Sequence, residues 1–410
     1  MRLQLSDTTG AGALLFAILL CAPLARAETP ASEAMSRDSA ESSESTDADG
    51  STQITSDALV YSDTDSVLVF SPQVTARQEL DDDGGEVSAR VVVDAITAAS
   101  VDVISNATYR FSEIRTQADL AVARRVAGFL PSVGYRYSYE PDYQSNGVRV
   151  GAARRLAGAD TVLGGSYGVT FDRIGRADTP RETFSRSLTS HAAEVSLTQV
   201  IDTRSLIRLV YSLTAQFGYM EKPYRSVPLF DQAGLDAAQA AGVELDLATY
   251  DNFRLATKPP EEVPDDRIRH AVAVRYLRYL PSVQASLRLD YRFYGDSWGM
   301  FAHTGELGVR RAITRCCLVH LWNRLHVQSS VSFWQRAYVV SDPLSIPALR
   351  TVDRSLSRSV HNTLGGRGEW ARGALRAYLE LAGMYSNFGD FLLLTHRFAV
   401  LTQAGVRWRF

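Results

Sequence analysis

The C-terminal segment 397–410, R-F-A-V-L-T-Q-A-G-V-R-W-R-F, alternates between apolar and polar side chains with a period of two. One parity carries Phe398, Val400, Trp408 and Phe410, whereas the other carries three arginines and a glutamine. This period predicts a β-strand with one apolar face and one polar face. In a soluble sandwich the polar face would meet water, whereas in a transmembrane barrel the apolar face would meet lipid. The segment alone leaves both folds open.

The same alternation recurs along the chain from about residue 53. In 282–294, for example, Leu287 and Leu289 lie on one face, whereas Arg288 and Asp290 lie on the other. Aromatic residues favour the ends of such segments, as expected for side chains at the two interfaces of a membrane. We count sixteen segments, near 53–61, 66–79, 86–95, 112–126, 131–140, 146–156, 161–173, 188–201, 205–217, 267–279, 283–294, 300–313, 317–332, 356–370, 374–385 and 397–410.

The connections between these segments alternate in length. Short connections lie at 81–85, 128–131, 157–160, 202–205, 280–282, 314–317 and 371–373. Longer connections lie between them, at 62–66, 96–111, 141–145, 174–187, 218–266, 295–300, 337–355 and 386–396. A soluble sandwich has no reason to keep this order, whereas outer-membrane barrels have short periplasmic turns and longer extracellular loops. An even number of strands also places both ends of the barrel on the periplasmic side.

The N-terminal part of the chain is typical of an exported protein. Residues 1–27 resemble a cleaved signal peptide, because a short apolar run is followed by the small-residue site A-R-A at 25–27. A lipoprotein acylated at Cys21 is a competing interpretation, although Leu20 fits that cleavage site poorly. Residues 28–52 are rich in Ser, Glu and Asp, and we expect them to form a disordered acidic segment. No later segment holds 18 consecutive apolar residues, so we expect no transmembrane helix after the signal.

Together these features predict an all-β fold, a transmembrane antiparallel up-and-down β-barrel over residues 53–410 with sixteen strands. The expected location is the bacterial outer membrane. The expected partners are outer-membrane lipid and, during biogenesis, the outer-membrane assembly machinery, for which Trp408 and Phe410 would form the terminal assembly signal. The net charge of −3 gives no reason to expect nucleic acid as a partner.

Six short motifs follow one another along this predicted barrel. They are Y-S-D-T-D-S-V-L-V-F-S-P (61–72), V-D-A-I-T-A-A-S-V-D-V-I-S (93–105), Y-S-Y-E-P-D-Y-Q-S-N (137–146), K-P-Y-R-S-V (222–227), R-Y-L-P (278–281) and Y-R-F-Y-G-D-S-W-G-M-F-A-H-T (291–304). In type and order they resemble the DUF3570 family of bacterial outer-membrane-type β-barrels. The resemblance runs from about residue 55 to the end and weakens at 316–317, in 337–355 and in 356–385. It implies a barrel, and it supplies no activity and no catalytic residues.

Acidic and aromatic residues cluster where strands are expected to reach the outer rim. The candidate binding residues at this rim are Asp63, Asp65, Asp94, Asp102, Glu140, Asp142, Arg225, Asp296 and Trp298. Carboxylates that converge on one rim can bind a hard cation such as Ca²⁺, and no other cofactor is expected. They can equally cap strand ends and tie loops to the wall through partners such as Arg225. None of the motifs has EF-hand spacing, so both interpretations stay open and no metal is assigned.

The inward-facing parity of the predicted strands is rich in arginine. The candidate lumen-lining residues are Arg208, Arg269, Arg275, Arg288, Asp290, Arg292, Glu306, Arg376, Glu380 and Arg407. A barrel of this size is wide enough to hold water, and charged rings in such a lumen select ions by sign. A ladder of arginine–carboxylate pairs that braces the wall is the equal alternative. The leading hypothesis is therefore a pore for small polar solutes or ions, and the alternative is a scaffold whose loops or periplasmic tail bind a periplasmic or surface protein.

Two further features bear on these hypotheses. Within the long connection 218–266, residues 231–246 favour a helix, which could plug the barrel mouth or cover it and dock a partner. Cys316 and Cys317 lie at a predicted periplasmic turn, and adjacent cysteines do not easily close a disulfide, so we expect free thiols.

We do not expect an enzyme, because neither G-x-S-x-G nor H-E-x-x-H occurs and the seven histidines are scattered.

Overall fold

The computed structural model describes residues 51–81, 85–98, 111–156, 160–177, 179–342 and 345–410. The predicted signal peptide and residues 28–50 of the predicted acidic segment lie outside these residues, whereas its last residue, Thr52, already begins the first strand. The strands of the wall are β1 (Thr52–Asp63), β2 (Val67–Asp81), β3 (Gly85–Ala98), β4 (Phe111–Ala123), β5 (Phe129–Tyr139), β6 (Tyr143–Arg155), β7 (Thr161–Ile174), β8 (Arg186–Asp202), β9 (Ser205–Gly218), β11 (Asp266–Leu280), β12 (Ala285–Asp296), β13 (Phe301–Ala312), β14 (Cys317–Gln328), β16 (Ser359–Arg372), β17 (Leu375–Asn387) and β18 (His396–Arg409).

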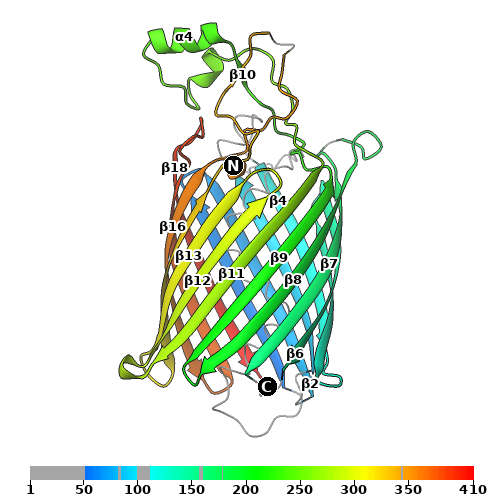
Figure 1. The fold of residues 1–410 in the computed structure, drawn as a ribbon, viewed down its shortest axis with the longest axis vertical. Coiled ribbons are helices and arrows are strands. Elements are labelled where there is room, and N and C mark those ends of the chain that lie inside the picture. Colours follow the sequence, from blue (N-terminus) through cyan, green and yellow to red (C-terminus); the bar gives the residue numbers. More distant parts are fainter. Residues whose placement is uncertain (1–50, 82–84, 99–110, 157–159, 178, 343–344) are drawn as a thin grey trace, which may run out of the picture.

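These sixteen strands form one closed antiparallel barrel, which confirms the predicted fold class (Figure 1). Each strand pairs with its neighbours in the chain, and pairing of β1 with β18 closes the wall. At the seam, the Thr52 and Phe410 backbones exchange two hydrogen bonds, with N···O distances of 2.8 and 2.9 Å. The Trp408 and Phe410 side chains beside this seam are exposed, and their rings meet edge to face with centroids 6.0 Å apart. Because closure leaves no free sheet edge in the wall, every strand finds partners on both sides.

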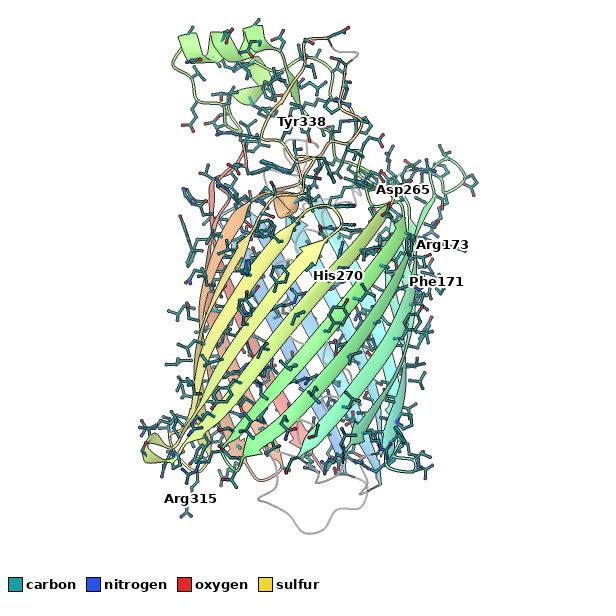
Figure 2. The ribbon with its side chains drawn as sticks, viewed as in Figure 1. Phe171, Arg173, Asp265, His270, Arg315 and Tyr338 are labelled. Carbon is teal, nitrogen blue, oxygen red and sulfur yellow. The ribbon has the colours of Figure 1, made fainter. Side chains whose placement is uncertain are left out.

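The outer face of the barrel is apolar along its strands. On β12 and β13, Leu289 and Leu307 lie directly opposite each other and are 43% and 49% exposed, and Tyr291 is 49% exposed. The same outward orientation of large apolar side chains continues around the wall (Figure 2). Proteins in water rarely expose a continuous apolar surface of this extent. The alternate residues, such as Arg288 and Asp290, face the interior. The period of two in the sequence therefore corresponds to an apolar outer face, as expected for contact with lipid, and a polar inner face, as expected for contact with water.

The two ends of the barrel differ in their connections. We call the end that carries the C-terminus the lower end and the opposite end the upper end (Figure 1). Lower-end turns are short, as at 203–204 between β8 and β9 and at 373–374 between β16 and β17. The upper end carries the long connections, above all 219–265 between β9 and β11 and 329–358 between β14 and β16. The predicted alternation of lengths therefore holds for the long connections, whereas the upper turns 64–66 and 140–142 are shorter than the lower-end turn 313–316.

Several predicted upper loops are shorter than expected, and two of them reduce to tight turns. The predicted loop 141–145 reduces to 140–142, because β6 already begins at Tyr143, and the predicted loop 62–66 reduces to 64–66. Asp63 explains the second case, since its Oδ1 accepts hydrogen bonds from the backbone N–H groups of Asp65 and Val67 at 3.0 Å each and closes a tight turn.

Two predicted strands are too long at the upper end. The segment predicted at 317–332 leaves the wall after Gln328, and the segment predicted at 356–370 enters it only at Ser359. Val331 and Leu356 continue the apolar pattern of their strands, but they are buried in a hydrophobic cluster above the wall. The sequence pattern therefore correctly predicts that these two side chains leave water. It wrongly places them against lipid, whereas they pack inside the protein above the wall.

The long upper connections fold together into one structure, which we call the upper cap and define as residues 219–265, 329–358 and 388–395. Within it, β10 (Leu229–Phe230) and β15 (Tyr338–Val339) form a parallel pair. Fully buried Leu229, Phe230 and Tyr338 anchor its small apolar cores. The cap therefore has an interior of its own rather than consisting of separate loops.

The helix predicted at 231–246 is shorter than expected and lies in the cap. It forms α4 (Gln232–Ala240), where the Asp231 carboxylate accepts the Gly234 N–H at 2.7 Å as an N-cap. It ends before Gly242, whose positive φ of 64° continues the chain away from the helix axis. Figure 1 shows α4 above the rim, outside the barrel, so the helix itself does not plug the lumen.

Short 3₁₀ turns complete the described elements: η1 (Tyr250–Asn252), η2 (Pro281–Val283) and η3 (Arg354–Leu356). Among the residues that the structure describes, no helix has the length and apolar character needed to cross a membrane.

Candidate functional site

The inner face of the barrel carries the candidate lumen residues. Cross-strand register places Arg275 opposite Asp290, and Arg376 opposite Arg407, on the face turned away from the exposed apolar side chains. The other predicted lumen residues occupy inward-facing positions of the same strands and their neighbours: Arg208, Arg269, Arg288, Arg292, Glu306 and Glu380.

A ladder of ion pairs crosses four strands of this inner face. The Asp290 carboxylate accepts hydrogen bonds from Arg275 Nε at 2.7 Å and from Arg288 Nε at 2.5 Å. Glu306 on β13 lies 3.7 Å from Arg288 Nη2 and 2.5 Å from Arg324 Nη2. The ladder thus alternates Arg–Asp–Arg–Glu–Arg across the wall and has a surplus of one positive charge. Sequence reasoning missed Arg324, which lies on β14 in a segment identified only as a strand.

Two smaller ladders lie elsewhere on the wall. Asp119 on β4 accepts from Arg90 Nη2 on β3 at 2.9 Å and from Arg136 Nε on β5 at 2.5 Å. On β16, Arg367 pairs with Glu369 at 2.9 Å and reaches Glu380 on β17 at 3.6 Å. These contacts support the bracing interpretation of the charged interior for the residues that take part in them.

Five of the seven predicted lumen arginines stand outside these ladders, and three of the five lie close together on the wall. Arg208, Arg269 and Arg292, on β9, β11 and β12, form no ion pair with any carboxylate among the described residues. Arg208 lies directly opposite another arginine, Arg275, and the Nε atoms of Arg208 and Arg269 are buried without a hydrogen-bond partner. Like charges on directly opposite positions are destabilising. Arg269 is aligned with Asp296, but that carboxylate already pairs with Arg267. Among the described residues, this strip of wall therefore carries a surplus of positive charge.

The candidate rim residues serve mostly as caps and ties. Asp65 pairs with Arg354 Nη1 at 2.6 Å, Asp94 with Arg115 Nη2 at 2.5 Å, and Asp296 with Arg267 Nη2 at 2.5 Å. Asp296 also caps its turn by accepting the backbone N–H groups of Trp298 and Met300 at 3.0 Å. The Arg267 guanidinium lies over the Trp298 ring, 4.1 Å from the centroid of that ring. The remaining candidate Asp102 falls outside the described residues.

Arg225 belongs to a buried ion-pair network at the base of the upper cap. Asp353 pairs with Arg225 and, at 2.6 Å, with Lys222 Nζ, and Glu261 lies 3.6 Å from Arg225 Nη1. Thr351 Oγ1 donates to Glu261 Oε1 at 2.5 Å. Burial alone would raise the pKa of Asp353, but the guanidinium of Arg225 and the ammonium of Lys222 hold it well below its usual range. The network joins the β9–β11 connection to the β14–β16 connection.

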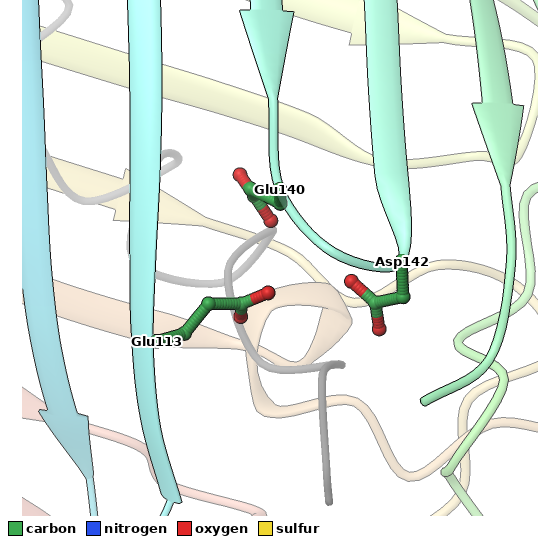
Figure 3. Close-up of side chains that lie close together, drawn as sticks. All are labelled: Glu113, Glu140 and Asp142. Carbon is green, nitrogen blue, oxygen red and sulfur yellow. The ribbon is translucent and has the colours of Figure 1, made fainter. Parts of the chain in front are cut away.

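Glu140 and Asp142 lie apart from these ties, in a cluster of three carboxylates at the upper end (Figure 3). The third member is Glu113, near the upper end of β4, and one ligand atom from each residue lies within 4.8 Å of the others. Burial raises the pKa of Glu140 to about 7, Arg115 opposes this, and the neighbouring charges of Asp142 and Asp94 raise it further. Burial also raises the pKa of Asp142. The cluster is thus an electrostatically unfavourable group, and sequence reasoning missed Glu113 because it lies inside a strand.

Four histidines that looked scattered in the sequence share one structural role. On the outer face, a tyrosine Oη and a histidine Nδ1 of the next strand form a hydrogen bond of 2.7–2.9 Å in each of four pairs. The pairs are Tyr167–His191, Tyr211–His270, Tyr291–His303 and Tyr385–His396. Figure 2 shows His270 on the upper part of the wall. Such amphipathic side chains suit the polar edge of a lipid layer.

Cys316 and Cys317 lie at the lower-end turn between β13 and β14. Both are free thiols, and their Sγ atoms are 3.4 Å apart, which is too far for a disulfide bond. Cys316 is exposed.

The sequence family follows from comparison with known proteins. The family described as "Protein of unknown function (DUF3570)" matches residues 104–365. The chain belongs to the DUF3570 family. This confirms the resemblance inferred from the motifs, although the matched region begins later than residue 55 and ends before the last two strands. No curated protein matches the chain.

Solved structures with a similar fold are outer-membrane proteins. A bacterial polysaccharide outer membrane secretin aligns over 89% of this chain and 100% of its own, with 8% identity and a TM-score of 0.47. CdiB from Acinetobacter baumannii aligns over 89% of this chain, which spans 61% of that protein, with 8% identity and a TM-score of 0.49. OprD from Pseudomonas aeruginosa aligns over 88% of this chain and 95% of its own, with 7% identity and a TM-score of 0.41. The likeness concerns the barrel fold alone.

Proposed function

We propose that this DUF3570 barrel lies in a bacterial outer membrane and forms a pore for small polar solutes or ions. The observation that carries the proposal is the accessibility of the charged interior. The side chains of Arg90, Arg275 and Arg288 remain 38%, 31% and 28% exposed although they face into a closed barrel. In a solidly packed interior such side chains would be buried, and barrels of sixteen strands are wide enough for an aqueous channel.

The proposal includes an orientation in the membrane. The short lower-end turns would face the periplasm, and the upper cap would lie outside, as in other barrels of this kind. The exposed apolar wall would contact outer-membrane lipid, and the Tyr–His pairs would lie near the polar edge of the outer leaflet. The exposed aromatic end formed by Trp408 and Phe410 would be read by the outer-membrane assembly machinery. The proposal assigns no catalytic residue.

A scaffold is the second candidate function, and the upper cap is the observation that favours it. The cap has its own buried cores and rises above the rim (Figure 1). It could dock a surface protein, and the ion-pair ladders would then brace a barrel whose lumen conducts nothing.

Solute flux into vesicles separates the two functions. We expect liposomes containing the folded full-length protein to swell in small neutral sugars faster than protein-free liposomes, with a rate that falls as the sugar becomes larger. The matched variant lacks 228–258, which removes α4 and β10. Val227 N donates to Pro259 O at 2.8 Å, so the two ends can be rejoined without stretching the chain. We expect this variant to remain a folded barrel and to swell at least as fast. Folded protein that causes no swelling in either form would reject the pore and favour the scaffold.

A further inference from the structure

Within the described part of the chain, the carboxylate cluster Glu113, Glu140 and Asp142 has less positive charge beside it than its burial requires. Glu113 and Glu140 are only 7% and 6% exposed. Among the described residues, the guanidinium that reaches the cluster is that of Arg115, whose Nε lies 3.9 Å from Glu140 Oε1. That guanidinium is already engaged at 2.5 Å by Asp94, outside the cluster. Buried charges are normally paired or bound to a metal ion, so most of the negative charge here is left without a described protein partner.

A second observation points to a ligand at the same place. Glu113 Oε2 is fully buried and has no hydrogen-bond partner among the residues that the structure describes. A buried carboxylate oxygen without a partner is rare in folded proteins, because the loss of water must be compensated by a bond. Figure 3 shows the carboxylate of Glu113 directed toward the space that it shares with Glu140 and Asp142. The unpartnered oxygen therefore belongs to a side chain that points into the cluster.

The surrounding structure holds two of the three carboxylates firmly. Tyr224 Oη, from the upper cap, donates to Asp142 Oδ2 at 2.9 Å. The backbone carbonyl of Asp142 accepts the N–H of Gly175 at 2.6 Å, and Glu140 exchanges backbone hydrogen bonds with Tyr143 across the tight turn. These contacts fix Glu140 and Asp142 on one side, and β4 fixes Glu113 on the other. The site is thus preformed on rigid elements rather than carried by a free loop.

We propose that Glu113, Glu140 and Asp142 bind a divalent cation, and that the cation is Ca²⁺. The three ligand oxygens come from carboxylates, which are hard donors that suit Ca²⁺ or Mg²⁺. Ca²⁺ accepts irregular coordination by carboxylates and water with bonds of about 2.3–2.6 Å, whereas Mg²⁺ demands a near-ideal octahedron with bonds of about 2.0–2.1 Å. Three carboxylates that are fixed on separate elements, with ligand atoms within 4.8 Å of one another, therefore suit Ca²⁺ better. Three protein ligands leave the remaining positions to water, which places the affinity near the weak, extracellular class of sites, with Kd on the order of 10⁻⁴–10⁻³ M.

A bound cation would change both the charge and the stiffness of the upper mouth. It would neutralise the carboxylate cluster and would tie β4 to the β5–β6 turn. Because Asp142 also contacts Tyr224, it would couple the barrel wall to the upper cap. The binding site itself does not depend on whether the barrel conducts solutes.

A shared proton is the alternative to a bound cation, since Glu113 and Asp142 are close enough to hydrogen-bond through one proton. The experiment must distinguish the two.

The experiment is isothermal titration calorimetry, in which CaCl₂ is added at fixed pH to folded full-length protein in a detergent that does not chelate metal. We expect one saturable site. Glu113→Gln and, separately, Asp142→Asn should each weaken binding by about tenfold or more, since loss of outer-shell partners alone already costs that much. Glu262→Gln, which removes an exposed carboxylate of the upper cap, should leave binding unchanged.

The melting temperature of the barrel provides a second measurement, independent of the heat of Ca²⁺ binding. In EDTA, the Glu113→Gln variant should melt at or above the wild-type temperature, because the substitution removes repulsion. Added CaCl₂ should then raise the melting temperature of the wild type and of the Glu262→Gln variant, but not that of the Glu113→Gln variant. No saturable heat up to about 20 mM CaCl₂, well above the weakest class of natural sites, would overturn the proposal. Binding that is unchanged in both the Glu113 and the Asp142 variants would overturn it as well.

Discussion

Replacing Asp353 with asparagine is expected to open the upper cap while the barrel stays closed. The substitution keeps the shape of the side chain but leaves Arg225 and Lys222 buried beside each other without their shared carboxylate. Removal of one partner from a buried pair typically costs about 3–5 kcal/mol, because it leaves an uncompensated buried charge. Limited trypsin digestion of the folded protein measures the effect, since the cap offers several basic cleavage sites. We expect cleavage in 219–265 and 329–358 to become much faster than in the wild type.

The matched control for this prediction is Asp251→Asn. Asp251 also pairs with two basic residues of the upper cap, Arg254 at 2.5 Å and Lys258 at 3.8 Å, but its side chain is 56% exposed. An exposed pair is worth at most about 1 kcal/mol, so this variant should resist trypsin like the wild type. Equal digestion rates for Asp353→Asn and the wild type, with the barrel intact in both, would show that the buried network does not hold the cap.

Neutralising the unpaired strip of the lumen is expected to shift the ion selectivity toward cations. The variant combines Arg208→Gln, Arg269→Gln and Arg292→Gln, three predicted lumen arginines that form no ion pair among the described residues. Three positive charges held at about 10 Å from the ion path in water together contribute roughly 1.2 kcal/mol, or about an eightfold change in local anion concentration before salt screening. The reversal potential across a bilayer in a salt gradient measures the shift, which should be larger at low ionic strength.

A charge-neutral pair deletion is the control for the selectivity measurement. Arg310 and Glu369 form a pair at 3.2 Å, and replacing both with glutamine removes one charge of each sign. We expect the reversal potential of this double variant to match that of the wild type. If the triple arginine variant also matches the wild type while still conducting, the unpaired strip does not set the selectivity.

The wall of the barrel could be predicted from the sequence because lipid and water impose opposite chemistry on alternate residues. That pattern identifies every strand, from the weak first segment at 53–61, which is β1, to the last at 397–410, which is β18. The pattern fails where apolar residues at the end of a strand pack against another part of the protein instead of facing lipid. Val331 and Leu356 continue the pattern of their strands, but they pack in the upper cap. The alternation predicts which side chains avoid water. It does not predict whether such a side chain contacts lipid or a hydrophobic cluster of the protein.

The side-chain contacts of the candidate site could not be predicted from the sequence, because they depend on the register between neighbouring strands. Arg275 meets Asp290 only because β11 and β12 align those two positions, and a shift of β11 by one residue would send Arg275 to the lipid face. Glu113 was missed for a related reason. It was assigned to a strand, and only the closed barrel brings it to the turn that holds Glu140 and Asp142. The tight turn at 140–142, had it been recognised, would have been the one sequence signal that these two carboxylates are fixed rather than mobile.

The most direct test of the pore is single-channel recording from the folded full-length protein in a planar lipid bilayer, repeated with the variant that lacks 228–258. The proposed function predicts discrete current steps in at least the shortened barrel, where α4 and β10 are absent, and steps of equal or smaller size in the full-length chain. Heat-modifiable mobility on a gel confirms beforehand that both proteins are folded barrels. Silence from both folded proteins would contradict the account and would leave the upper cap, rather than the lumen, as the functional part of the molecule.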